Sequence, residues 1–470
     1  MLLKTRFALC QLRWFSSKVT IKLNESFNAL LESSEARHRK HPGIVARNVI
    51  HLPKHILKAM DIVLEDVPNK PSILEECVQF KNHLHGRHIP VEENESREKY
   101  ETIQQHLMRN IRIDNLSDAE IEALAKKSRP KALKMLKKYT NMWKAINFDA
   151  HRSLLYMIAR SSQDYAVLYS IFDEIRTRDK NFKPETVLDF GSGIGTTMWA
   201  TNEQWPNIIK EYMNVDISLD ISNLSETIMK IAHPNFNGIF YRQFMPMSLR
   251  PNYDIVVSAY SLIELPNAKT RLDAVMKLWN KTKSYLVIVE NGNNAGFNLV
   301  NEARDFVLLL SNSSSEADNK DVTHAFAPIF QCPHDLACPR LSADNTPCNF
   351  EVGYTSSPLI GNVTTQSERY SYVVLKKGTR SETDGDWPRL VRPTLKRGKH
   401  AFCRMCCSSG NLEEIIFTRS KHGRNLYRCA RVSRWGDRLP VVKNIESNAT
   451  IENESSSGDK EESEGSSKKE

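Results

Sequence analysis

Residues 187–196 read Val-Leu-Asp-Phe-Gly-Ser-Gly-Ile-Gly-Thr, and this stretch decides the fold that the sequence predicts. The apolar run Thr186–Phe190 carries one acid near its end and is followed by three alternating glycines. Residues 196–205 then have the pattern of a helix. Glycines at a strand-to-helix turn let the backbone approach a ligand closely, while the helix N-terminus faces that ligand. The stretch therefore predicts a strand, a ligand-binding turn and a helix in succession.

The glycine spacing separates two kinds of nucleotide-binding turn. A dinucleotide fingerprint requires G-x-G-x-x-G, but Thr196 stands at the position of its last glycine. The order D-x-G-x-G-x-G instead resembles motif I of class I S-adenosylmethionine-dependent methyltransferases. This resemblance implies S-adenosyl-L-methionine as a cofactor. Its candidate binding residues here are Asp189, Gly191, Gly193 and Gly195. Gly-Ser-Gly also makes ordinary tight turns, so the prediction depends on the strands around it.

Further apolar segments predict a parallel sheet. One of them ends in Asp216, where such folds place a carboxylate that accepts both ribose hydroxyls of the cofactor. Near-continuous apolar strands that alternate with helices, such as 269–280, indicate a sheet covered on both faces. We therefore expect an α/β fold of the class I S-adenosylmethionine methyltransferase-like (Rossmann-like) type. The predicted strands after the first are 211–216, 238–244, 253–259, 284–290 and a closing strand at 368–376.

The N-terminus predicts the compartment. Residues 1–18 contain four basic residues, and no acid occurs before Glu25. This pattern is typical of a mitochondrial presequence, although a basic N-terminus also arises by chance. No stretch of about 20 apolar residues occurs, so no membrane span is expected. We expect a protein of the mitochondrial matrix.

The chain has 470 residues, which is long enough for two or more domains. Changes in composition along the sequence predict where these domains begin and end. The first part has mostly helical patterns, with breaks expected at 91–98 and at Pro130. Its lysine-rich helix faces are either solvated surface or RNA contacts. The acidic, Ser-rich tail is expected to be disordered. The predicted divisions are a presequence (1–18), a helical N-terminal domain (19–180), a methyltransferase-like domain (181–380), a basic Cys-containing segment (381–444) and the tail (445–470).

Seven of the nine cysteines lie in the last third of the chain. The matrix does not favour structural disulfides, so clustered thiols there point to a metal. Cys332 and Cys338 each precede a proline, and Cys348 follows ten residues after Cys338. Three nearby cysteines and a remote fourth fit a [4Fe–4S] cluster. The alternatives are zinc, which favours paired knuckles such as Cys403-x-x-Cys406, and no metal at all.

The fourth ligand has three candidates, Cys403, Cys406 and Cys407. Adjacent side chains normally point apart, so Cys406 and Cys407 are not expected to bind one cluster together. We predict Cys406, with Cys403 as the next choice. Cys429, in a strand-like segment, and Cys77 are expected to be packed residues.

Residues 389–438 combine many basic side chains with aromatic ones and only three acids. Dense positive charge with aromatic residues is typical of surfaces that bind the RNA backbone and unstacked bases. We therefore expect RNA contact. The basic residues are Arg389, Arg392, Lys396, Arg397, Lys399, His400, Arg404, Arg419, Lys421, His422, Arg424, Arg428, Arg431, Arg434 and Arg438; the aromatic ones are Phe402, Phe417, Tyr427 and Trp435.

These features together resemble the mitochondrial methyltransferase-like family associated with the small ribosomal subunit. The resemblance covers roughly residues 115–440 and rests on the glycine motif, the order of the cysteines and the segment from His422 to Asp437. It implies an assembly factor of the mitochondrial small subunit that binds immature rRNA and ribosomal proteins, with a class I fold and a [4Fe–4S] cluster. It implies neither a membrane nor a DNA partner.

The catalytic half of a methyltransferase is missing from the sequence. Base-amino methyltransferases carry Asn/Asp-Pro-Pro-aromatic after the fourth strand, but residues 258–266 read Ser-Ala-Tyr-Ser-Leu-Ile-Glu-Leu-Pro. No cysteine nucleophile stands there either. Glu264 could act as a base, but a surface carboxylate is the expectation. We assign no catalytic residue and expect an inactive methyltransferase-like protein; the alternative is an active S-adenosylmethionine-dependent rRNA methyltransferase.

Overall fold

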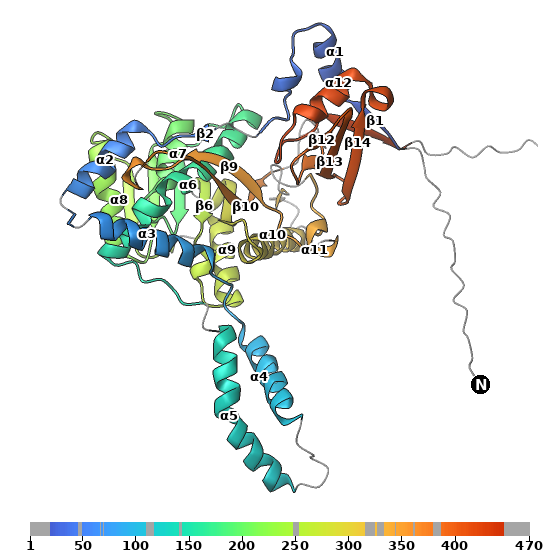
Figure 1. Ribbon diagram of the computed structural model, residues 1–470. Helices are drawn as coiled ribbons and strands as arrows, with labels where there is room; N and C mark the ends of the chain where they lie inside the picture. Colours follow the sequence, from blue (N-terminus) through green and yellow to red (C-terminus); the bar gives the residue numbers. More distant parts are fainter. Residues whose placement is uncertain are drawn as a thin grey trace, which may run out of the picture.

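The computed structural model describes residues 19–45, 49–65, 67–68, 70–109, 117–140, 143–247, 253–314, 325–326, 333–343, 345–360, 362–378 and 387–445. These residues form an α/β body, a projecting hairpin of two helices and a C-terminal β-rich module (Figure 1). The predicted presequence, nearly all of the tail and Cys332 lie outside the described residues. Across the residues that are described, no helix is both long and apolar enough to cross a membrane.

The body is built on a mixed sheet whose strands run in the order β2-β9-β10-β7-β6-β3-β4-β5, with β8 beside β10. Strands β3 to β7 are parallel, which confirms the predicted core of the methyltransferase-like fold. The predicted closing strand, β10, is antiparallel to β7. The strands are β2 (Val49–Ile50), β3 (Thr186–Phe190), β4 (Glu211–Val215), β5 (Ile239–Arg242), β6 (Tyr253–Ala259), β7 (Thr282–Asn291), β8 (Ala325–Phe326), β9 (Phe350–Thr355) and β10 (Thr365–Lys377).

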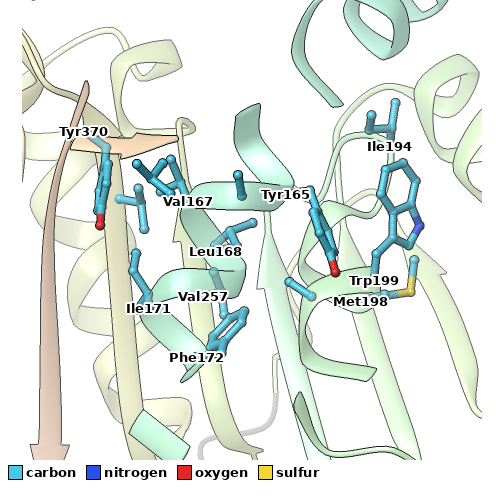
Figure 2. Packing of buried hydrophobic residues seen from close by; sticks show 14 of the residues in the cluster. Tyr165, Val167, Leu168, Ile171, Phe172, Ile194, Met198, Trp199, Val257 and Tyr370 are labelled. Carbon is cyan, nitrogen blue, oxygen red and sulfur yellow. The ribbon is translucent and has the colours of Figure 1, made fainter. Parts of the chain in front are cut away.

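Helices cover both faces of this sheet because successive strand residues point to opposite sides. Val257 of β6 packs with one set of helices, and its neighbour Val256 packs with the other. The first set is α2 (Lys54–Glu65), α3 (Lys70–His85), α6 (Ala150–Arg178), α7 (Thr196–Gln204) and α8 (Leu219–Ala232); the second is α9 (Ala268–Lys281) and α10 (Asn294–Ser314). Figure 2 shows Leu168 and Phe172 of the buried α6 in the first of these clusters.

The C-terminal module includes residues from both ends of the described chain. Strand β1 (Val19–Leu23) pairs antiparallel with β15 (Val441–Ile445), and α1 (Glu25–Glu32) lies beside the module (Figure 1). Residues 19–32 therefore lie apart from the helices with which the sequence grouped them. The predicted strand around Cys429 is wrong, because this residue lies in α12. The other elements are β11 (Arg389–Leu390), β12 (Leu395–Arg397), β13 (His400–Cys406), β14 (Leu412–Thr418) and α12 (Arg419–Val432).

The hairpin consists of α4 (Glu93–Met108) and α5 (Asp118–Thr140) and projects away from the sheet (Figure 1). The break predicted at 91–98 exists but lies mostly earlier, at 86–92, because α3 ends at His85 and α4 begins at Glu93. The break predicted at Pro130 is wrong, because α5 continues through this residue. A capping interaction starts α5, since the Glu120 carboxylate accepts hydrogen bonds from the backbone N–H and the hydroxyl of Ser117, at 2.9 and 2.8 Å.

Candidate functional site

The glycine turn after β3 has the backbone that its sequence predicts. Gly191, Gly193 and Gly195 have φ values of +71°, +51° and +88°, a region that residues with a Cβ rarely adopt. A Cβ on Gly191 would lie 2.4 Å from the Cβ of Ser261, so a side chain at this position has no room. Gly195 is the N-cap of α7. The turn therefore presents backbone, and not side chains, at the carboxyl ends of the strands.

Two carboxylates flank this turn. Asp216 follows β4 and accepts hydrogen bonds from the backbone N–H groups of Gly193 and Ser218, both at 3.0 Å. Burial raises the pKa of its carboxyl above the usual range, and these two bonds oppose the rise. Asp189 is buried within β3, and its Oδ1 has no hydrogen-bond partner among the described residues. Burial raises the pKa of Asp189 to about 7, against a hydrogen bond from the Thr197 side chain.

A cavity of about 480 Å³ opens at these strand ends, a size within the range of small-molecule sites. Three predicted residues, Gly191, Gly193 and Asp216, line it. Asp189 lines a smaller adjoining cavity together with the first two of these glycines. Gly195 lines neither and acts instead at the helix start. The arrangement fits S-adenosylmethionine, because the Asp216 carboxylate, the exposed backbone of the glycine turn and the buried carboxylate of Asp189 gather at one place.

The N-terminal helices supply the far wall of the cavity, which sequence reasoning missed. Residues 145, 146 and 148 line it from the chain that follows α5. Glu264, in the short helix η2 (Leu262–Glu264), lines it too and forms an ion pair with Arg87. Its Oε2 also accepts a hydrogen bond from the Ile146 N–H at 3.1 Å. The expectation of a surface carboxylate is therefore wrong. The Glu264 side chain is 26% exposed, and its contacts connect η2 to Arg87 and Ile146 in the wall of the cavity.

A buried charged layer lies beside the cavity. The Arg160 guanidinium bonds Asp164 at 2.5 Å and Glu368 at 3.0 Å, and the ring of Tyr260 lies 5.0 Å from it. Tyr260, which follows β6, has φ +57° and a buried hydroxyl to which no described residue offers a hydrogen bond. Non-glycine residues with this backbone cluster at ligand sites. The spacing of Arg160 and Asp164 along one helix face was the only signal in the sequence for this layer.

The cysteines separate into two groups. Cys338, Cys348 and Cys406 are buried in the same hydrophobic cluster as the sheet and α6, whereas Cys403, Cys407 and Cys429 pack in the core of the C-terminal module. The Sγ of Cys406 lies 3.2 Å from Nε2 of His334, so the end of β13 approaches the segment that carries the first cysteines. None of the described cysteines forms a disulfide.

The segment that carries Cys338 and Cys348 is held by neighbouring elements. Arg304 of α10 donates to the carbonyls of His334 and Leu336, at 3.3 and 2.8 Å. The Ser371 hydroxyl donates to the carbonyl of Cys348 at 3.0 Å. Within the described part of the chain, no group of three His, Cys, Asp or Glu side chains lies close enough together to hold a metal ion. The four predicted ligands therefore stay a prediction.

The basic and aromatic side chains predicted to contact RNA include both exposed and buried ones. Arg389 and Phe417 are buried, so neither is available to RNA, contrary to the expectation. The strand register places the tip of the β12–β13 hairpin next to the start of α12, because Arg397 pairs with His400 and His400 pairs with Thr418. Exposed basic residues gather there and along α12. They are Lys396, Arg397, Lys399, His400, Arg419, Lys421, Arg424, Arg428 and Arg434.

Comparisons with known proteins identify relatives that cover most of the chain. A family model described as "Mitochondrial small ribosomal subunit Rsm22" matches residues 150–440. The human protein "Ribosome assembly protein METTL17, mitochondrial" is 37% identical over 409 residues, which are 86% of this chain and 86% of the human one. "Ribosome assembly protein RSM22, mitochondrial" of Saccharomyces cerevisiae is 19% identical over 423 residues, covering 62% of this chain and 66% of that protein.

Solved structures include methyltransferases, but with low overall similarity. The magnesium protoporphyrin IX methyltransferase of Synechocystis PCC 6803 with bound SAH has a TM-score of 0.28 and 12% identity, covering 54% of this chain and 97% of that one. The fold is therefore assigned from the strand order of the chain itself and not from this similarity. The family match spans more than half of the chain and confirms the resemblance seen in the sequence: the chain belongs to the Rsm22 family of the mitochondrial small ribosomal subunit.

Proposed function

We propose that this protein is an assembly factor of the mitochondrial small ribosomal subunit that acts in the matrix and binds immature small-subunit rRNA. The observation that carries the proposal is the human relative, which is named a mitochondrial ribosome assembly protein and is similar over 86% of both chains. The partners are the rRNA and the ribosomal proteins of that subunit.

The surface that supports rRNA binding is the exposed basic group of the C-terminal module. Lys396, Arg397 and Lys399 project from one hairpin, and Arg419 and Lys421 begin the neighbouring helix. Lysine and arginine side chains displace counterions from nucleic-acid phosphates, and this displacement drives sequence-independent binding. The partly buried aromatic rings of Phe402 and Tyr427 offer stacking surfaces for unpaired bases.

We propose that the protein carries a [4Fe–4S] cluster with Cys332, Cys338, Cys348 and Cys406 as ligands. Two observations support this set: the approach of Cys406 to His334, which lies on the segment with the first cysteines, and the separate packing of Cys403 and Cys407. Thiolates are the usual ligands of such clusters. The cluster would join the end of β13 to the loop after α10 and thereby stabilise the junction of body and module.

In this proposal S-adenosyl-L-methionine is a structural ligand, and the protein transfers no methyl group. Asp216 and the glycine turn would bind the cofactor, whose activated methyl group is the chemistry it supplies to active enzymes. The only acid in residues 258–266 is Glu264, and it is held by Arg87 and Ile146, so it is not placed as a free base. The alternative, an active rRNA methyltransferase, is favoured by the intact cavity and its carboxylates.

Co-sedimentation tests the assembly role. The tagged full chain, expressed in mitochondria, is expected to migrate with small-subunit particles and to be absent from complete ribosomes. Replacing Lys396, Arg397, Lys399 and Arg419 with glutamate should release it from those particles. A chain that migrates only with free matrix protein, or equally with complete ribosomes, would contradict the proposal.

Iron and sulfide analysis tests the cluster. The anaerobically purified full chain should contain about four irons and four sulfides and absorb broadly near 400 nm. Serine at Cys338, Cys348 or Cys406 should abolish this iron content, whereas the matched variant Cys407→Ser should retain it. Zinc without sulfide, or iron loss that is equal in all variants, would refute the ligand set.

Radiolabelled cofactor tests activity. We expect calorimetry to detect binding of S-adenosylmethionine to the purified chain, with no transfer of its tritiated methyl group to small-subunit rRNA or particles. Transfer that is abolished by Glu264→Gln would instead establish the active methyltransferase.

A further inference from the structure

The C-terminal part of α5 is an unbalanced basic surface. Between residues 126 and 138 the helix has seven basic residues and no acid, and all seven are exposed. None of the seven forms an ion pair or side-chain hydrogen bond with the described part of the chain. They are Lys126, Lys127, Arg129, Lys131, Lys134, Lys137 and Lys138. This segment of α5 carries no counter-charge of its own and attracts an external anion.

The opposite face of α5 is occupied by α4. Its less exposed residues recur every three or four positions, which is the spacing of a helix stripe packed on a partner. These residues are Ile121, Leu124, Ala125, Ser128, Ala132, Met135 and Leu136. Because this stripe faces α4, most of the basic side chains lie away from the hairpin seam, toward solvent. At about 1.5 Å per residue, residues 126–138 span about 18 Å along the helix.

Both ends of the hairpin are fixed to the body at one place. Before α4, Arg87 pairs with Glu264, and the Glu92 carboxylate accepts the Ala268 N–H at 2.7 Å. After α5, the indole N–H of Trp143 donates to the carbonyl of Ile263 at 2.7 Å. The helices beyond this base project from the body as an arm (Figure 1). A base fixed in this way lowers the entropic cost of holding the arm against a partner.

We propose that the α4–α5 hairpin is a second rRNA-binding arm, in which the basic face of α5 binds the phosphate backbone. The proposal rests on the assembly role proposed above. The composition of the face distinguishes RNA from other polyanions. Lysine is depleted at protein–protein interfaces, so six lysines among seven bases do not suit an acidic protein. The face also lacks the aromatic anchors by which amphipathic helices enter a membrane surface.

Charge reversal along one stripe of α5 tests the arm. The full chain carries Lys127→Glu, Lys131→Glu, Lys134→Glu and Lys138→Glu, and binding to transcribed mitochondrial small-subunit rRNA is measured at several KCl concentrations. We expect at least a tenfold weaker affinity. The slope of log K against log[KCl] should fall by about 3, since each of four lost contacts contributes about 0.7. A variant with glutamine at the same four positions should also bind rRNA more weakly, and its circular dichroism should equal that of the unmodified chain.

The matched control reverses four exposed lysines elsewhere on the body, Lys54, Lys58, Lys180 and Lys183. It should bind within about twofold of the unmodified chain, because it changes net charge equally without touching the arm.

Three results would overturn the arm. If the α5 variant binds like the control while the C-terminal variants lose affinity, the arm is wrong and the assembly role stands. If the α5 variant binds naked rRNA normally but no longer joins the small subunit, the partner of the arm is a protein. If the unmodified chain itself neither binds this rRNA nor joins the particles, the proposed function fails, and the arm with it.

Discussion

Arg389 of the C-terminal module forms a buried, two-pronged ion pair with Glu174 of α6. The two guanidinium nitrogens Nη1 and Nη2 each lie 3.1 Å from a carboxylate oxygen, and both side chains are at most 3% exposed. The hydroxyl of Tyr372 donates to the same carboxylate at 2.9 Å. Because 215 residues separate the pair along the chain, this contact joins the basic module to the methyltransferase-like body.

Arg389→Met should destabilise the protein by about 3–5 kcal/mol, because it leaves the Glu174 carboxylate buried without its main counter-charge. The free energy of urea unfolding measures this loss. The matched control is Arg404→Met, which breaks the exposed pair with Glu414 and should cost about 0–1 kcal/mol. The double variant Glu174→Gln with Arg389→Met should lose less than the two single losses added together. Equal losses for the two Met variants would contradict the structural role of the pair.

The central sheet could be predicted from the sequence because its signals are local. Three features can each be recognised from a short stretch of sequence, and all three lie where they were expected: the strand before Gly191, the acid after β4 and the apolar run of β6. The positions of Gly191, Gly193 and Asp216 on one cavity followed from the same rule, since the carboxyl ends of parallel strands meet at one edge.

Long-range contacts could not be predicted in this way. Nothing near Val19 in the sequence indicates that it pairs with Ile445, and nothing near Arg87 indicates its partner Glu264. Pro130 was expected to break a helix, because proline removes one backbone hydrogen bond. In the structure α5 continues through Pro130 and packs on α4, a second helix that local patterns do not reveal.

Asp216→Ala should weaken S-adenosylmethionine binding about 10- to 100-fold. The variant removes the carboxylate predicted to accept the ribose hydroxyls, and hydrogen bonds to charged groups contribute about 1.5–3 kcal/mol. It also removes the acceptor for the Gly193 N–H and so loosens the turn. Titration calorimetry with the cofactor checks the result. Asp220→Ala, an exposed acid four residues away, is the control and should leave the affinity unchanged. Unaltered binding by the Asp216 variant would remove this residue from the cofactor site.

Arg87→Gln should loosen the base of the hairpin without unfolding the body. The Ile146 N–H is bonded to Glu264, which Arg87 holds in place. Hydrogen–deuterium exchange of peptides covering residues 143–149 should therefore become faster, while peptides from α6 keep their protection. Lys99→Gln breaks the exposed pair with Glu95 on the arm itself and should leave exchange at 143–149 unchanged. The same exchange rate in both variants would mean that Arg87 does not hold the base.

Glu290 should make stability depend on pH. The residue is fully buried at the end of β7, where one carboxylate oxygen accepts the Leu262 N–H at 2.9 Å and the other has no hydrogen-bond partner in the described part of the chain. Burial raises its pKa from 4.5 to about 8; Glu264 adds to the rise, whereas the bonded N–H groups and Arg87 oppose it. The folded state therefore holds a proton that the unfolded state releases above pH 4.5. The stability from this group is fully present below that pH and is lost as pH rises through about 8.

Glu290→Gln separates this effect from the titration of other groups, because the amide has nearly the shape of the protonated acid and carries no charge at any pH. The melting temperature of the unmodified chain should fall relative to the Gln variant between pH 5 and pH 9, with a difference in unfolding free energy on the order of a few kcal/mol. Glu122→Gln, at an exposed position on α5, should follow the unmodified chain throughout. If the Glu290 and Glu122 variants give parallel curves, Glu290 is ionised in the folded protein, and the unpartnered oxygen must then be stabilised by a ligand or by water in the neighbouring cavity.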